Sequence, residues 1–260
     1  MNNPDPAGAT KVAAVTFAFW IMKICATTLG ETGGDLLSMT LGLGYAASSL
    51  ILIGFFLAVL IAQLAMPRFH PALYWAVILA TSTAGTTISD LMDRTLGLGY
   101  ARGALILVTL LVLVLATWRF SLGSVSVARI AERKAEIFYW MAILVSNTLG
   151  TALGDFLADS SGLGYGASNL LISAAIALIA LAYFLTPFSR TALFWAAFVL
   201  TRPFGATMGD LLTKPPAQGG LGFGTIGASA VLFVVLLGFV IATSQRARRA
   251  AALPRFRPSR

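Results

Sequence analysis

Residues 26–35, Ala-Thr-Thr-Leu-Gly-Glu-Thr-Gly-Gly-Asp, are followed at residues 42–45 by Gly-Leu-Gly-Tyr. Both segments belong to a pattern that starts at Trp20, with glycine at the tenth residue after it and aspartate at the fifteenth. The same offsets follow three later tryptophans, giving Trp75 with Gly85 and Asp90, Trp140 with Gly150 and Asp155, and Trp195 with Gly205 and Asp210. A Gly-Leu-Gly-aromatic segment closes each copy, at one shared offset for residues 97–100 and 162–165 and three residues later for 220–223. Four copies of one unit therefore make up the chain.

The composition places these repeats in a membrane. The 260 residues are 58% hydrophobic and 11% charged, with a mean hydropathy of +0.85, whereas soluble domains carry about 25% charged residues. The formal net charge of +8 does not indicate a nucleic-acid partner, because so few charged residues form no basic face. The single cysteine, Cys25, excludes an intrachain disulfide, and the single histidine, His70, excludes a multi-histidine metal site.

Each unit holds two runs of the roughly 20 apolar residues that cross a bilayer core. The first runs lie near residues 12–31, 71–91, 136–156 and 190–211, and the second runs near 46–66, 101–118, 166–186 and 225–243. We therefore expect an all-α integral membrane protein with eight transmembrane helices. Because every unit has an even number of spans, the four two-helix repeats are parallel. The four tryptophans are 55, 65 and 55 residues apart, so the chain also divides into two halves offset by 120 residues.

The charged segments set the expected boundaries and the topology. The boundaries are a disordered N-terminus at 1–10, repeat 1 at 11–67, repeat 2 at 68–118, a basic connector at 119–135 with room for a short amphipathic helix, repeat 3 at 136–187, repeat 4 at 188–244 and a basic tail at 245–260. Thirteen of the 18 basic residues lie before the first span, between units or in the tail. The positive-inside rule makes these segments and both termini cytoplasmic. The Gly-Asp segments then lie at the opposite face of the membrane or dip into it.

The two spans of a unit differ in polarity. The second is almost purely aliphatic, as in residues 50–57, whereas the first turns polar toward its far end, as in residues 81–87. Since lipid offers hydroxyl groups no partner, we expect the four polar first helices inside and the four apolar second helices outside. We also expect the glycines to break each first helix and free backbone carbonyls for coordination, and the tryptophans to form an interfacial belt.

Parallel repeats bring the four repeated aspartates together. Carboxylates with hydroxyls and carbonyls are the ligands that Mn²⁺, Mg²⁺ and Ca²⁺ prefer. Three further acids occur in one copy each, which favours a transporter over a symmetric channel. Glu31 and Asp35 form the strongest candidate pair, because a spacing of four places both on one face of a continuing helix. The predicted metal-binding set is Glu31, Asp35, Asp90, Asp155, Asp210, Asp93 and Asp159.

Structural roles for the same residues stay open. Each repeated aspartate is equally explained as a helix cap or a partner of backbone amides in a Gly-rich turn. Five basic residues outside the cytoplasmic set are available to neutralise the acids in structural pairs: Lys23, Arg94, Arg102, Arg202 and Lys214. Lys23 and Arg202 lie within first helices. They act there either as counter-cations that replace the substrate in the empty state, or as permanent salt-bridge partners of an aspartate in another repeat.

Two resemblances bear on the function. Phe19-Trp20, residues 26–35 and the later Gly-Leu-Gly-Tyr together resemble a bacterial family of uncharacterised membrane-anchored proteins over nearly the whole chain. That resemblance implies a multispan protein of the bacterial inner membrane. Locally, Glu31-Thr-Gly-Gly-Asp35 is similar to the E-x-G-D motif of a family of manganese and calcium exporters, which implies Mn²⁺ or Ca²⁺ as the ion. This chain differs in having one more residue between the acids, Leu36-Leu37 after them, and four copies where the exporters have two.

The leading functional hypothesis is an inner-membrane cation transporter, with a divalent metal exported through the acidic cluster. The alternatives are a proton-coupled carrier or channel for a monovalent or organic cation, and a membrane scaffold or regulatory subunit whose basic tail binds anionic lipid or a partner. An enzyme is not expected, because no Ser-His-Asp set, phosphate-binding loop or Cys-His pair can be assembled. No permanently bound cofactor is expected. The expected partners are the lipid bilayer and a small inorganic cation, and the sequence sets no oligomeric state.

Overall fold

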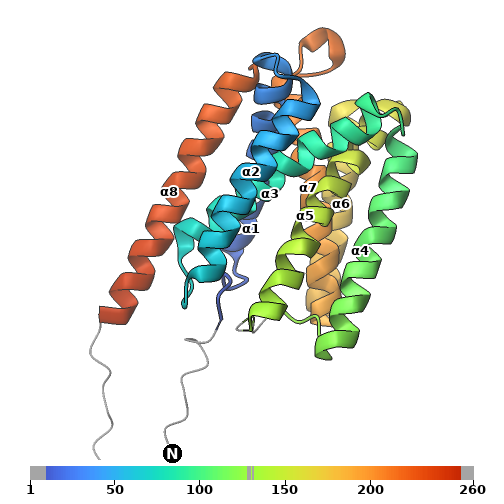
Figure 1. Cartoon of the computed structure of the whole chain (residues 1–260). Helices are drawn as coiled ribbons and strands as arrows, with labels where there is room; N and C mark the ends of the chain where they lie inside the picture. Colours follow the sequence, from blue (N-terminus) through green and yellow to red (C-terminus); the bar gives the residue numbers. More distant parts are fainter. Residues whose placement is uncertain (1–9, 128–129, 131, 253–260) are drawn as a thin grey trace, which may run out of the picture.

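The computed structural model describes residues 10–127, 130 and 132–252, and this part of the chain folds into eight α-helices without a strand (Figure 1). The prediction of an all-α protein is therefore confirmed. The helices are α1 (Phe17–Asp35), α2 (Gly44–Ala65), α3 (Pro71–Asp90), α4 (Tyr100–Leu122), α5 (Arg133–Asp155), α6 (Gly164–Leu185), α7 (Arg190–Thr213) and α8 (Thr225–Ala252).

Local sequence signals start three of the polar helices. The Thr16 hydroxyl accepts a hydrogen bond from the Phe19 backbone N–H, and the Ser189 hydroxyl accepts one from Ala192 N–H at the start of α7. At the start of α3 the acceptor is His70 Nδ1, and Pro71 occupies the first helical position. These side chains satisfy backbone donors that a helix N-terminus leaves free, and proline at the first position has no donor to lose.

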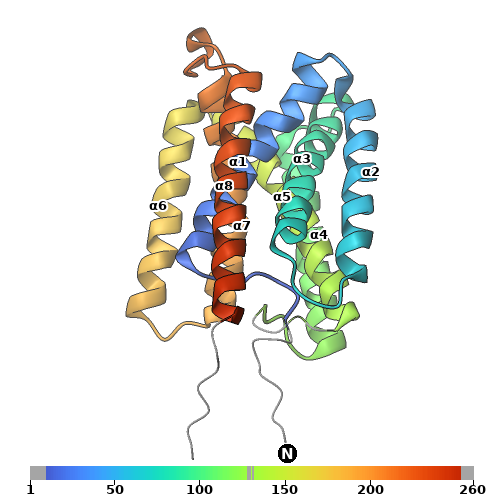
Figure 2. The same cartoon turned by 90° about the vertical axis from the view of Figure 1, so that its left-hand side faces the viewer.

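The four first helices, α1, α3, α5 and α7, form a closed inner ring, and the second helices lie outside it. Around the ring α1 packs against α3, α3 against α5, α5 against α7, and α7 against α1. Figures 1 and 2 show α4, α6 and α8 at the periphery of the bundle. The polar helices are therefore the buried ones, and α1 and α5 lie diagonally opposite each other, as do α3 and α7.

Each second helix packs mainly on the first helix of the next repeat. The extensive contacts are α2 with α3, α4 with α5, α6 with α7, and α8 with α1. The last helix thus closes the circle on the first, and Figure 2 shows α8 lying alongside α1. A repeat is therefore a unit of sequence whose two helices contact each other mainly near their connecting turn. Its apolar face is buried only when the neighbouring repeats are present.

The repeated glycines allow the inner helices to approach closely. A Cβ at Gly85 would lie 2.9 Å from the backbone nitrogen of Thr148, and one at Gly205 would lie 2.7 Å from the carbonyl carbon of Thr27. Gly30 faces Ser82, and Gly150 faces Arg202, in the same way. Small residues at such crossings let backbones pack without a side chain between them. The prediction that these glycines break the helices is wrong, because α1 continues from Gly30 through Asp35.

The helices change form beyond the aspartates. A π-helical turn follows Asp35, Asp90 and Asp155, over Leu36–Thr40, Leu91–Thr95 and Phe156–Ser160. In the fourth repeat α7 stays α-helical to Thr213, and a short 3₁₀ turn, Pro216–Gln218, follows it. Single π-turns within helices are frequent at functional sites. In the first three repeats the residue four positions after the aspartate lies within this π-turn.

The Gly-Leu-Gly-aromatic segments turn the chain from the inner ring to the outer helix. Both glycines have positive φ in the first three repeats, with values of +69° and +75° at Gly42 and Gly44. In the fourth repeat the pair with these angles is Gly222 and Gly224, both at +72°. The sequence pattern predicts that the fourth segment starts at Gly220. In the structure the equivalent segment starts at Gly222. The inserted 3₁₀ turn accounts for the shift.

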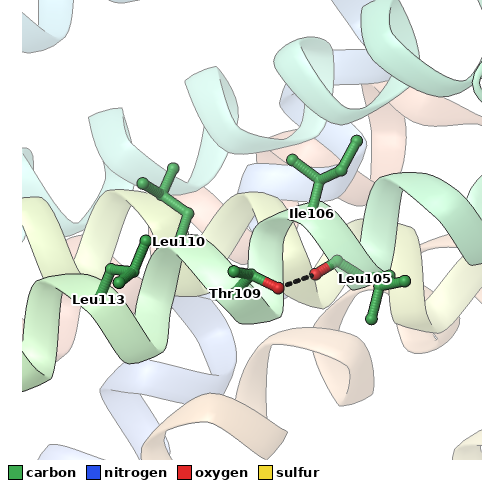
Figure 3. A pocket seen from close by; sticks show the side chains of 5 residues that line it. All are labelled: Leu105, Ile106, Thr109, Leu110 and Leu113. Carbon is green, nitrogen blue, oxygen red and sulfur yellow. Dashed lines mark hydrogen bonds between the residues drawn. The ribbon is translucent and has the colours of Figure 1, made fainter.

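The outer helices present apolar surfaces suited to lipid. In the part of the chain that the structure describes, five helical segments are long and apolar enough to cross a membrane: the outer helices Gly44–Ala65, Tyr100–Leu122, Gly164–Leu185 and Thr225–Gln245, and the inner segment Arg133–Ser160. Figure 3 shows one outer face of α4, a shallow hollow lined by Leu105, Ile106, Thr109, Leu110 and Leu113. The Thr109 hydroxyl donates to the Leu105 carbonyl at 2.8 Å, so the polar group on this face has a partner within its own helix. These helices indicate a multi-pass membrane protein.

The end of the bundle where α1, α3, α5 and α7 begin is called the Trp end, and the opposite end the Asp end. Lys11 lies at the Trp end, where its Nζ is 2.6 Å from Glu136 Oε2 and its backbone N–H donates to the Ile130 carbonyl. Gln63 donates to Glu136 and to the Lys11 carbonyl. The segment before α1 and the connector before α5 are thus joined by a buried polar network.

The N-terminus, the connector and the tail can each be compared with the expected boundaries. The expected disordered residues 1–10 lie outside the described residues, except for the last of them. The connector forms no amphipathic helix in its described part, because α4 ends at Leu122 and the described residues between it and Arg133 are irregular. The expected tail begins within a helix, since α8 continues to Ala252.

Candidate functional site

The inner ring is a stack of four-residue layers, one residue from each of α1, α3, α5 and α7. Successive layers are four residues apart along the helices, so their side chains lie on the same helix face. The order from the Trp end to the Asp end is an aromatic layer, a layer with one lysine, a layer of polar groups, a layer with one glutamate, the four aspartates, and a final layer with two bases. Their chemistry changes from apolar to strongly charged.

Paired aromatic residues close the Trp end. The first residue of each pair contacts the tryptophan of the next repeat, with ring centroids 5.7 Å apart for Phe19–Trp75 and 5.4 Å apart for Tyr74–Trp140. The other two contacts of the circle are Tyr139–Trp195 and Phe194–Trp20. Trp75, Trp140 and Trp195 are buried. The prediction of an interfacial tryptophan belt is therefore wrong for these three, because their side chains pack among the inner helices, whereas Trp20 is half-buried.

Lys23 lies in the next layer, where the other repeats have Ile78, Ile143 and Phe198. Its side chain is fully buried, with Nζ 3.2 Å from Asn147 Oδ1 and 4.0 Å from the centre of the Phe198 ring. Since α5 lies diagonally opposite α1, the lysine side chain crosses the middle of the ring. Among the described residues no carboxylate pairs with it. The expected salt bridge from Lys23 to an aspartate is thus absent from this part of the chain.

Arg202 fills the middle of the ring, one layer closer to the Asp end than Lys23. The guanidinium Nη1 is 3.0 Å from Glu31 Oε2, and Nη2 donates to Thr151 Oγ1 at 2.7 Å. Nη2 also donates to Thr86 Oγ1 and to the Ser82 carbonyl on α3, the diagonal helix. Arg202 is fully buried and contacts all three other inner helices. The predicted partner of Arg202 was an aspartate, whereas the structure gives it the glutamate that only repeat 1 carries.

The four aspartates are held in two pairs, each by one basic side chain. Arg94 bridges Asp90, at 3.0 Å, and Asp155, at 3.1 Å. Lys214 bridges Asp210, at 3.1 Å, and Asp35, at 2.8 Å. In both cases the base lies four residues after one aspartate and reaches the aspartate of the next repeat around the ring. The two ion triads are named by their bases, the Arg94 triad and the Lys214 triad.

The two aspartates of the Lys214 triad form a compact group of carboxylates with Glu31. One oxygen from each of Glu31, Asp35 and Asp210 lies within 4.8 Å of the other two, and all three residues are buried. This arrangement confirms that α1 continues and that Glu31 and Asp35 share a face. It also brings together residues 179 positions apart along the chain, as the Lys214–Asp35 bond shows. Three convergent carboxylates are a ligand set for a hard cation.

The ionic cluster as a whole contains more carboxylates than bases. Its five carboxylates are Glu31, Asp35, Asp90, Asp155 and Asp210, and its three bases are Arg94, Arg202 and Lys214. With every group ionised, the formal charge is −2. A buried excess of carboxylates is unfavourable unless a cation or protons offset it. One divalent cation, or two monovalent cations or protons, supplies the missing charge.

Lys214 is only partly shielded from solvent. It follows the last residue of α7, and its side chain is 16% exposed. Burial lowers the pKa of Lys214, but Asp210 and Asp35 raise it more, so the net shift is upward. The ammonium group therefore remains charged while it is held between the carboxylates.

Two predicted acids lie outside the cluster. The Asp93 carboxylate accepts a hydrogen bond from Ser89 and faces Gly103 at the start of α4. Asp159 is exposed and accepts a hydrogen bond from the Tyr100 hydroxyl at 3.4 Å. The helix-cap alternative is wrong for Asp35, Asp90 and Asp155, because they lie at the C-terminal ends of α-helices and make no side-chain cap bond.

The polar residues around Glu31 and Arg202 were not singled out from the sequence. Asn147, Thr86 and Thr151 contribute side chains to this network, and Thr86 also donates to Glu31 at 3.2 Å. A signal for them was present in the repeat. Thr86 and Thr151 occupy the position of Glu31, and Asn147 occupies the position of Arg202, so aligning the four copies by layer identifies them.

Fold and site together define an all-helical protein built from four internal repeats around a buried ionic core, and its apolar helices indicate a multi-pass membrane protein. The chain belongs to the family described as Repeat of Unknown Function (DUF347), whose model matches residues 18–69, 73–123, 138–187 and 193–249. Neither a curated protein nor a solved structure matches this chain. The likeness to manganese and calcium exporters stays a prediction from residues 31–35.

Proposed function

We propose that this protein is a membrane cation transporter whose binding site is the carboxylate group Glu31, Asp35 and Asp210. The observation that carries the proposal is their convergence: three buried carboxylates from α1 and α7 place oxygens within 4.8 Å of one another. Lys214 contacts two of them and takes the place of a transported cation. When a cation binds, Lys214 moves out of the group, and when the cation leaves, it returns.

A divalent cation is the substrate that the charge balance favours. With Lys214 moved out, the cluster has a formal charge of −3, which a divalent cation offsets better than a monovalent one. Its ligands are all oxygen atoms, which suits Mn²⁺, Ca²⁺ or Mg²⁺. Charged groups within membrane proteins are costly and are retained mainly where ions or protons bind. The local similarity of residues 31–35 to manganese and calcium exporters supports Mn²⁺ as the first ion to test, and export as the direction.

The topology that accompanies this function has eight spans. α1, α3 and α7 are too polar to be identified as spans by composition, but the outer helices shield the inner ring from lipid. The start of α1 and the end of α8 lie at one end of the bundle (Figure 1), and the four aspartates lie at or near the C-terminal ends of α1, α3, α5 and α7, toward the other end. The excess of basic residues near the Trp end makes that end cytoplasmic, in a bacterial inner membrane.

Transport by the purified chain in liposomes tests the proposal. A metal-sensitive dye inside the liposomes reports entry of Mn²⁺, Ca²⁺ or Mg²⁺ down a concentration gradient. We expect the double variant Asp35→Asn, Asp210→Asn to reduce the flux at least about tenfold, because it removes two of three ligands. Asp159→Asn is the matched control, since that aspartate is exposed, and it is expected to keep the wild-type flux. Equal flux in the double variant and the wild type would contradict the proposal.

A second candidate substrate is a monovalent or organic cation. One observation favours it: the group that the carboxylates hold in this structure is a primary ammonium. The same liposomes therefore also receive gradients of Na⁺, K⁺ or methylammonium. Flux that depends on Asp35 and Asp210 for these ions, without flux of divalent metals, would assign the site to a monovalent cation.

A further inference from the structure

Lys23 has no role in the binding site described above, yet it is fully buried in the middle of the inner ring. Three of the four repeats place an apolar residue in its layer, so the repeat itself does not require a base there. Its contacts are an amide oxygen, Asn147 Oδ1, and the face of the Phe198 ring. The charged form of a buried amine needs compensation, and these two contacts supply little of it.

The two layers next to Lys23 contain one charged side chain. On α7 that charge is Arg202, which repels it. The other titratable groups of α7 are Arg190 and Asp210, at its two ends. On α3 they are Tyr74 in the aromatic layer and Asp90 in the aspartate layer, and on α5 they are Arg133, Lys134, Glu136, Tyr139 and Asp155. On α1 itself they are Cys25, Glu31 and Asp35, and α8 has none between residues 225 and 245. Lys23 therefore sits between a cation and an apolar layer.

A continuous polar network links Lys23 to the binding site. Asn147 accepts from Lys23 and donates to Thr81 Oγ1 at 2.9 Å and to Ser82 Oγ at 3.3 Å. The Ser82 carbonyl accepts from Arg202, which pairs with Glu31. All of these residues except Glu31, which is 3% exposed, are fully buried. A change of charge at the carboxylates thus reaches Lys23 through groups that lie in low-dielectric surroundings.

A surface groove lies on the Trp-end side of Lys23. A groove of about 170 Å³ opens beside the start of α1 and is lined by Phe19, Met22 and Trp75, among others. Met22 precedes Lys23, and Phe19 lies one turn before it. Lys23 itself is fully buried and does not line the groove.

We propose that Lys23 is the proton-binding residue of the transporter, which holds a proton when the carboxylate site lacks a substrate cation and releases it when a cation binds. The inference rests on the proposed function and adds its coupling ion. Glu31 and Lys23 are eight residues apart, or about 12 Å along a helix. A divalent cation that displaces Lys214 adds one net positive charge, which at that distance lowers the proton affinity of Lys23 about tenfold. Arg202 has no comparable capacity, because guanidinium does not deprotonate in proteins.

Proton release on metal binding tests this role directly. Mn²⁺ is titrated calorimetrically into the purified full chain in buffers with different ionisation enthalpies, which gives the number of protons released per ion bound. The variant Lys23→Ile restores the residue of repeats 2 and 3, and Lys134→Met, on the exposed surface, is the matched control. We expect the wild type and Lys134→Met to release up to about half a proton more than Lys23→Ile, with a maximum at one pH.

The outcomes separate the two proposals. Absence of Mn²⁺ binding to the wild type would overturn the proposed function and the coupling with it. Binding with equal proton release in the wild type and Lys23→Ile would overturn the coupling and leave the binding site in place. If Lys23→Ile does not fold, Lys23→Gln keeps the hydrogen bond to Asn147 and replaces it in the comparison. Lys23→Arg adds a further arm: a permanent charge is expected to reduce Mn²⁺ flux in liposomes about tenfold, and wild-type flux would overturn the coupling.

Discussion

The Arg94 triad and the Lys214 triad are built on the same plan and differ in their bases. In each, the base bridges the aspartate four residues before it and the aspartate of the next repeat, with contacts of 2.8 to 3.1 Å. Arg94 and Lys214 are 120 residues apart, so they are equivalent in the two halves of the chain. In the other two repeats Met39 and Asp159 occupy this position. A fourfold arrangement of aspartates is thereby divided into two halves.

The base determines what each half can do. The Arg94 guanidinium also donates to the Tyr45 hydroxyl at 3.3 Å and lies near the Tyr100 ring. Its planar group makes several directed contacts, whereas the Lys214 ammonium is a compact charge on a flexible chain. Glu31 joins the Lys214 triad and gives it a third carboxylate. We infer that the Arg94 half holds the ring together and that the Lys214 half exchanges its cation.

Removing each base gives the largest expected effect. Arg94→Met leaves Asp90 and Asp155 buried without a partner, and loss of one member of a buried ion pair costs about 3–5 kcal/mol. Lys214→Met leaves Asp35 and Asp210 in the same condition. Added Mn²⁺ at about 100 times its dissociation constant is expected to restore about 2.7 kcal/mol to Lys214→Met, because the metal binds the three carboxylates. Arg94→Met is expected to recover less, since its site lacks a third carboxylate.

Thermal unfolding of the purified protein with and without Mn²⁺ measures this difference. Asp159→Asn is the control for general effects of charge at this end of the bundle, because its carboxylate is exposed. Equal recovery of Arg94→Met and Lys214→Met with the metal would show that the two halves are equivalent.

The sequence predicts the fold better than it predicts the site. The spacing of Trp20, Gly30 and Asp35 repeats four times, and the polarity of the first helices is enough to place them inside. The pattern does not show that α2 packs on α3 or that α8 closes on α1, because such contacts join separate repeats. Nor does it show that Gly85 meets Thr148. The sequence predicts that glycine breaks the helix, whereas in the structure its lack of a side chain lets neighbouring helices pack closely.

The sequence predicts the acidic residues of the site, but it does not predict which base pairs with which acid. Glu31 and Asp35 follow from their spacing on one helix. The pairing of Lys214 with Asp35 depends on which repeats are neighbours in the ring, and the choice between Asp93, which lies outside the cluster, and Asp90, which lies inside it, depends on the π-turn that follows α3. Reading each layer across all four copies recovers part of this, because Arg94, Asp159 and Lys214 then align.

Exchanging each base for the other type is expected to have a smaller effect than removing it. Lys214→Arg keeps the positive charge, so the free energy of unfolding is expected to change by less than about 1 kcal/mol. Cation flux is expected to fall about tenfold, because a guanidinium bound by two carboxylates is harder to displace than an ammonium. Arg94→Lys, the matched exchange on the other half, is expected to keep the wild-type flux. Flux in liposomes measures both variants, and a loss in Arg94→Lys equal to that in Lys214→Arg would assign exchange to both halves.

The smallest expected effect comes from the tyrosines that flank the triads. Tyr45→Phe removes the hydrogen bond from Arg94, and a single hydrogen bond to a charged group contributes about 1.5–3 kcal/mol when buried and less when exposed. Because the Arg94 side chain is 31% exposed, we expect a loss of about 1 kcal/mol in the free energy of unfolding. Tyr165 has the equivalent position in the third repeat, and no described residue makes a hydrogen bond to its hydroxyl, so Tyr165→Phe is the matched control. Chemical unfolding in detergent compares them, and equal losses would mean that the Tyr45 contact adds nothing to the hold on Arg94.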